Sequence, residues 1–96
     1  MHKITIGESP NYKIFVGTGS MFPQEFQVRA NSEENALAII ANHCEKRAMD
    51  WLYIYSGELA GLCGKDETVN AYAARQDLTE CGENGIYMQI KGIEEI

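Results

Sequence analysis

The sequence lacks a long hydrophobic run. Its longest apolar stretches, residues 36–41 and 51–55, are far shorter than the roughly 18 residues that a membrane-spanning helix needs. Residues 1–8 also contain no apolar stretch of the length found in signal peptides. A chain of 96 residues is too short for two ordinary domains. We therefore expect one small cytoplasmic domain that spans residues 1–96 and does not bind a membrane.

Cysteine is scarce, and no two cysteines lie at the spacing of a metal-binding pair. The chain has three, Cys44, Cys63 and Cys81, and an odd number of distant cysteines is a poor disulfide framework. A zinc site would have to combine His43 or Cys44 with Cys63 and Cys81, without the local pair of ligands that anchors such sites. We therefore expect free thiols, no metal site and no cofactor.

Catalytic motifs are also missing. Residues 57–66 are rich in glycine, but Leu59 stands where a phosphate-binding loop needs glycine, and Asp66 stands where it needs a hydroxyl. Cys63 lies in this loop, two residues before Lys65, which is a setting that can activate a thiol. A nucleophile also needs a nearby base, and the sequence points to none. A catalytic or ligand-binding domain that uses Cys63 is therefore the alternative to a non-enzymatic protein.

Positive charge is scarce in one half of the chain. Residues 1–48 carry five acids and five bases, whereas residues 49–96 carry nine acids and three bases. The formal net charge of −6 therefore belongs to the C-terminal half. An excess of negative charge disfavours direct binding to nucleic acid, which needs a positive patch. It favours a basic protein surface as the partner, including the surface of a nucleic-acid-binding protein.

Two sets of side chains are candidate partner contacts. The acidic set recurs through the second half of the chain and comprises Asp66, Glu67, Asp77, Glu80, Glu83, Glu94 and Glu95. The aromatic set alternates along a predicted strand, which places its members on one face: Trp51, Tyr53 and Tyr55. The aromatic set would equally suit the core of a central strand. It does not suit a platform for single-stranded nucleic acid, because no base lies between residues 47 and 65.

Alternation of apolar and polar residues predicts about five strands, at residues 3–6, 12–16, 25–30, 51–55 and 86–91. The sequence Ser9-Pro10-Asn11 between the first two predicts a hairpin turn. Residues 81–85 contain Asn-Gly, a strong turn signal before the last strand. Residues 56–65 are predicted to form a loop with one helical turn at about 58–62.

The clearest predicted element is an amphipathic helix at about residues 33–48. Asn31 and Ser32 are both suitable N-caps, and Glu34 stands at the capping-box spacing from Asn31. One apolar stripe follows the helical period, at Leu37, Ile40, Ala41, Cys44 and Ala48. A shorter helix at about 67–76, capped by Asp66, is favoured over a strand because its alanines are poor strand formers. The predicted class is α+β, with an antiparallel or mixed sheet and the main helix packed on one face.

In size, acidity and simplicity the chain resembles the small single-domain proteins of phages and mobile elements. These include anti-CRISPR proteins, many of which bind and block nucleic-acid-handling enzymes. The resemblance involves no motif and implies no particular site residue. Our main hypothesis is a non-enzymatic acidic binding module that occupies a basic, nucleic-acid-binding surface as an inhibitor. The alternatives are the Cys63-based domain and a subunit that self-assembles into a homo-oligomer through a strand edge or the aromatic face.

Overall fold

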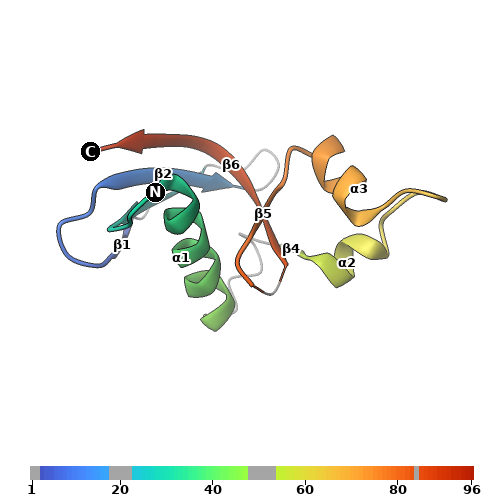
Figure 1. Cartoon of the computed structure of the whole chain (residues 1–96), viewed down its shortest axis with the longest axis horizontal. Helices are drawn as coiled ribbons and strands as arrows, with labels where there is room; N and C mark the ends of the chain where they lie inside the picture. Colours follow the sequence, from blue (N-terminus) through green and yellow to red (C-terminus); the bar gives the residue numbers. More distant parts are fainter. Residues whose placement is uncertain (1–2, 18–22, 48–53, 84) are drawn as a thin grey trace.

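The computed structural model describes residues 3–17, 23–47, 54–83 and 85–96 (Figure 1). Their elements follow in the order β1 (Lys3–Ile6), β2 (Tyr12–Gly17), β3 (Gln24–Val28), α1 (Glu33–Lys46), β4 (Ile54–Tyr55), α2 (Ser56–Ala60), α3 (Val69–Arg75), β5 (Thr79–Cys81) and β6 (Ile86–Glu95). The predicted α+β class, with one main helix and a short second helix after it, is confirmed. None of the described helices is long and apolar enough to cross a membrane.

The strands within the described residues form one mixed sheet of six strands. Their order is β1-β3-β2-β6-β4, and β5 also pairs with β6. β1 runs parallel to β3, and all other pairs are antiparallel. The first residues of β6 pair with β4 and β5, whereas its later residues pair with β2. β6 therefore connects the two ends of an elongated molecule, whose extents are 46 × 26 × 23 Å (Figure 1).

The predicted hairpin between the first two strands is wrong, because β3 lies between them. Phe26 of β3 pairs with Ile4 on one side and with Ile14 on the other. The connection at residues 7–11 therefore spans two strand spacings, roughly 10 Å, which a two-residue hairpin turn could not do. A hydrogen bond holds the start of this connection to the end of β3, because the N–H of Arg29 donates to the carbonyl of Ile6. Up to this point β1 and β2 both pair with β3 without a shift in register.

Helix α1 packs on one face of the sheet and closes the main core. Ile40, Ala41 and Cys44 are fully buried, as the apolar stripe predicted. Leu37 is only partly buried, and Ala36 is buried instead. The sheet contributes further buried side chains to this core, among them Ile14, Val16, Phe26, Val28, Ile86 and Met88. Ala48, the last predicted member of the stripe, lies outside the described residues.

The N-terminus of α1 uses the second of the two predicted N-caps, without the capping box predicted between Asn31 and Glu34. Ser32 is the N-cap, and its Oγ accepts a hydrogen bond of 3.1 Å from the N–H of Asn35. The side-chain oxygen of Asn35 accepts in return from the N–H of Asn31, at 3.0 Å. Asn35 therefore takes the reciprocal role that the spacing had assigned to Glu34, because the helix begins one residue later than a cap at Asn31 requires.

Helices α2 and α3 form a second, smaller apolar cluster at the other end of the molecule (Figure 1). Leu59, Ala73 and Tyr87 are buried there. α3 begins after Thr68, whose Oγ1 accepts from the N–H of Ala71 at 3.1 Å. The predicted cap at Asp66 is therefore wrong, as is the strand alternative, whereas the helix predicted at about 67–76 is confirmed and begins two residues later. The predicted helical turn near residues 58–62 is present as α2, two residues earlier.

Candidate functional site

The structure divides the predicted acidic set into three groups. Asp66 and Glu67 lie in the connection between α2 and α3. A second group follows α3 and continues through β5 into the β5–β6 turn: Asp77, Glu80 and Glu83. The third group, Glu94 and Glu95, ends β6 at the opposite end of the strand. Glu94 and Glu95 therefore lie apart from the other five acids, at the far end of β6.

Glu67 belongs to the internal structure of the first group. Its carboxylate oxygens lie 3.2 Å from two nitrogens of the Arg75 guanidinium, and one of them accepts from the N–H of Gly64 at 2.9 Å. The hydrogen bond from Arg75, then that from Gly64, holds the pKa of Glu67 below its ordinary value. This carboxylate joins Arg75 of α3 to Gly64 in the preceding loop. Its charge is therefore less available to a partner than that of an unpaired acid. Asp66 is exposed and has a positive φ of 69°.

The second group presents negative charge without compensation. Asp77, Glu80 and Glu83 are all exposed. Among the residues that the structure describes, the only salt bridge joins Arg75 to Glu67, and it removes one of the few bases from this half. Glu80 has a neutral partner, because the hydroxyl of Tyr87 lies 3.4 Å from its carboxylate. We call these three acids the hairpin acids.

Tyr87 fixes the position of the strand that carries Glu80. It is 4 % exposed, and its hydroxyl also lies 2.9 Å from the side-chain oxygen of Asn70 on α3. Burial, followed by the nearby charge of Glu80, raises the pKa of Tyr87. Tyr87 therefore ties α3 and β5 to β6 and stays neutral at physiological pH.

The third group faces a different environment. Glu94 and Glu95 are exposed, and their strand positions pair with Lys13 and Tyr12 of β2. Lys13 supplies positive charge next to Glu94 on the same sheet face, since directly paired residues of antiparallel strands share a face. This end of β6 is therefore less strongly negative than the hairpin acids.

The aromatic set is only partly described. Trp51 and Tyr53 lie outside the described residues, so the prediction that they form a contact or a core stays a prediction. The backbone of Tyr55 lies in β4 and pairs with Ile86 of β6. Tyr55 therefore lies in a strand, as predicted, and residues 51–53 of the predicted strand lie outside the described residues.

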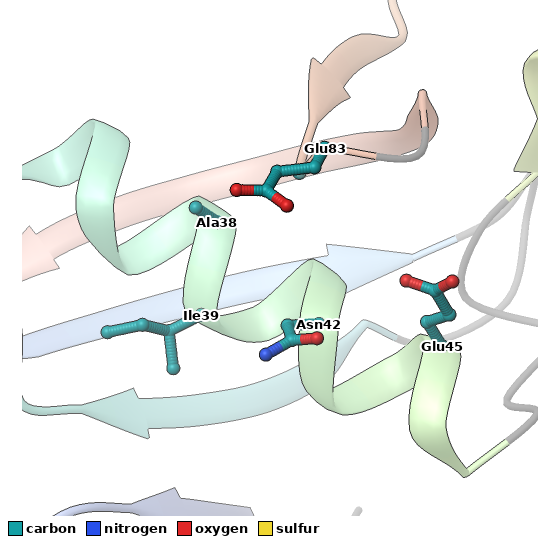
Figure 2. Close-up of a pocket in the computed structure, with 6 residues that line it drawn as sticks. Ala38, Ile39, Asn42, Glu45 and Glu83 are labelled. Carbon is teal, nitrogen blue, oxygen red and sulfur yellow. The ribbon is translucent and has the colours of Figure 1, made fainter.

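One groove lies beside the hairpin acids, between α1 and the β5–β6 turn (Figure 2). It encloses about 300 Å³ and is lined by Ala38, Ile39, Asn42, Glu45, Gly82 and Glu83. Gly82 allows the turn to approach α1: its φ is +80°, and a Cβ at this position would lie 3.2 Å from the Cβ of Ala41. Sequence reasoning missed this groove, because its walls come from residues far apart in the chain. Its only signal in the sequence was Gly82, which lies within the predicted turn at residues 81–85.

The cysteines and His43 lie in separate surroundings. Cys44 and Cys81 are buried in the main core, and burial raises the pKa of their thiols to about 12 and about 11. The ring of His43 contacts Phe26 of β3 edge-on, with 6.1 Å between ring centroids, and burial lowers its pKa. Cys63 is partly exposed in the loop after α2, where its thiol lies 3.2 Å from the carbonyl oxygen of Leu59.

Within residues 3–17, 23–47, 54–83 and 85–96, no group of three or more His, Cys, Asp or Glu side chains is placed so that it could hold a metal ion. The hydrogen-bond partner described for the Cys63 thiol is the carbonyl oxygen of Leu59, and the thiol also lies within electrostatic range of the Arg75 guanidinium. The clearest features of the described surface are the hairpin acids and the adjoining groove.

No family model, no curated protein and no solved structure matches this chain. Its function has to be inferred from its own surface.

Proposed function

We propose that this chain is a non-enzymatic binding module that uses its hairpin acids to bind a basic protein surface. The observation that carries the proposal is that Asp77, Glu80 and Glu83 are exposed along one short stretch and form no salt bridge within the described residues. Clustered charge of one sign raises the local potential and attracts a partner of the opposite sign. A basic surface that binds the phosphates of nucleic acid carries the lysines and arginines that such a cluster attracts.

Two structural features support a binding role for this stretch rather than a purely solvating one. The β5–β6 turn is packed against α1 through Gly82, and β5 is held to β6 and α3 by Tyr87. The hairpin acids are therefore presented by a fixed framework, which reduces the entropy that ordering them on binding would cost. The adjoining groove provides concave surface beside the charge.

Affinity capture from a lysate of the source cell tests the proposal through paired variants. One bait carries Asp77→Lys, Glu80→Lys and Glu83→Lys, and the control bait carries Glu8→Lys, Glu33→Lys and Glu34→Lys. Both sets replace three exposed acids and change the net charge equally. We expect the first set to lose the captured partner and the control to retain it, because only the first reverses the contact. Free DNA or RNA should then compete with the chain for that partner.

The control set needs a measurement of its own. Glu33 and Glu34 lie in the first turn of α1, where acids interact favourably with the helix dipole. Thermal unfolding of both variants therefore has to show that they are folded at the temperature of capture. If the two folded variants capture the partner equally well, the hairpin acids are not the contact and the proposal fails.

A further inference from the structure

The groove between α1 and the β5–β6 turn combines an apolar part with an acidic rim. Ala38 and Ile39 supply the apolar part. Glu83 extends from the turn over α1, with its carboxylate directed toward Ala38, and Glu45 lies further along the helix (Figure 2). Asn42 lies between them on α1 and adds an amide group. The lining thus contains two carboxylates and no basic residue among the described side chains.

These features restrict what the groove can bind. Two carboxylates favour a cation, and an apolar floor favours an occupant with a hydrocarbon stem. A volume of about 300 Å³ lies at the lower end of the range for small-molecule sites, so it suits one side chain better than a large ligand. Arginine and lysine are the side chains that combine a terminal cation with an apolar stem.

Building on the proposed function, we propose that this groove binds an arginine side chain of the basic partner. The stem lies on Ile39 and Ala38, and the guanidinium donates to the carboxylate of Glu83 and to the side-chain oxygen of Asn42. Arginine suits the groove better than lysine because its flat guanidinium offers five N–H donors to acceptors on two sides and is more weakly hydrated beside apolar groups. The groove would therefore select an arginine within a generally basic surface.

A peptide titration tests this directly. The labelled chain is titrated with acetyl-Gly-Arg-Gly-amide and followed by amide chemical shifts in NMR spectra. We expect saturable shifts, with a dissociation constant on the order of 1 mM for so small a ligand, concentrated at Ala38, Ile39, Asn42, Glu45, Gly82 and Glu83. The peptide with citrulline in place of arginine has nearly the same shape without the charge and should give no saturable shifts. The lysine peptide should bind at least about threefold more weakly.

Two matched variants separate the groove from the general negative charge. Ala38→Arg places a cationic side chain inside the groove and should abolish the peptide shifts. Ala74→Arg makes the same change on an exposed alanine of α3, away from the groove, and should retain them. Glu83→Gln should weaken peptide binding about tenfold. Equal responses of the two arginine variants, or shifts spread evenly over all acidic residues, would overturn the proposal.

The groove and the proposed function can fail independently. The peptide titration involves no partner, so its outcome does not depend on whether the hairpin acids bind a protein. In the capture experiment, Ala38→Arg should reduce recovery of the partner relative to Ala74→Arg. Equal recovery with both, together with loss on reversal of the hairpin acids, would refute the groove and leave the binding module standing. Loss of neither would refute the binding module.

Discussion

At the scale of single residues, the role of an acid in this chain depends on its partners rather than on its charge alone. Glu67 and Asp66 are neighbours in the sequence, yet Glu67 binds Arg75 and Gly64 whereas Asp66 is exposed in a connection. The hairpin acids have no cationic partner among the described residues. The sequence shows that all these positions carry negative charge. Only the structure shows which of them form no salt bridge within the described residues and can therefore attract a basic partner.

The first prediction concerns Glu67 and pH. Its pKa is lowered in the folded protein, so its charged form stabilises the fold at neutral pH, and this stabilisation is lost as the pH falls through the lowered pKa. We expect the wild type to be more stable than Glu67→Gln at about pH 7, and this difference to become smaller as the pH is lowered to about 3. Urea unfolding at both pH values measures the difference.

Glu8→Gln provides the control for this measurement, because Glu8 is exposed in the β1–β2 connection and has no described salt bridge. It should show little difference from the wild type at either pH. A difference between wild type and Glu67→Gln that persists unchanged at the lower pH would mean that the Glu67–Arg75 pair does not stabilise the loop through charge.

At the scale of elements, α1 was predicted well because its signal is local. Capping residues, first-turn acids and a periodic apolar stripe all agree along this one segment. Its register differs slightly from the prediction: Leu37 is partly buried and Ala36 is buried instead. Ala36 and Leu37 precede Ile40 by four and three residues, so the helical period fits both, and only contact with the sheet decides which one faces the core.

The second prediction follows from this difference. Ile40 is fully buried, so Ile40→Ala should reduce the free energy of unfolding by about 2–5 kcal/mol. Leu37→Ala should cost roughly half as much or less, because Leu37 is still partly solvated in the folded protein. Urea unfolding of both variants provides the comparison. If Ile40→Ala cost less than about 0.5 kcal/mol, the stripe would not face the core.

Strand pairing could not be predicted to the same degree. Alternation located β1, β2 and β3, but the order in the sheet depends on contacts between distant segments, and Phe26 pairs with strands on both sides. β5 was missed because its three residues are too few to show alternation. Tyr87 and Met88 are both buried although they point to opposite faces of β6, because each faces a different apolar cluster. Alternation of apolar and polar residues predicts one buried face, so it could not predict that both faces of β6 are covered by apolar clusters.

At the scale of the whole molecule, the excess of negative charge could be predicted from the sequence. The arrangement of the acidic side chains in space could not. The net charge of −6 is spread over an object 46 Å long, and β6 separates the hairpin acids from Glu94 and Glu95 by roughly 25 Å along the strand. Each group therefore acts on a partner nearly independently at physiological ionic strength, since the Debye length there is only about 8 Å.

The last prediction follows from this separation. Association with the partner should be steered by the hairpin acids, so the association rate should fall at least about tenfold as ionic strength rises from about 0.1 M to about 1 M. Reversal of Asp77, Glu80 and Glu83 should remove most of this salt dependence, whereas Glu94→Lys with Glu95→Lys should change it much less. Stopped-flow mixing with the captured partner measures both rates. A salt-insensitive rate with equal effects of the two variants would move the contact to Trp51, Tyr53 and Tyr55, because desolvated aromatic contacts depend little on salt.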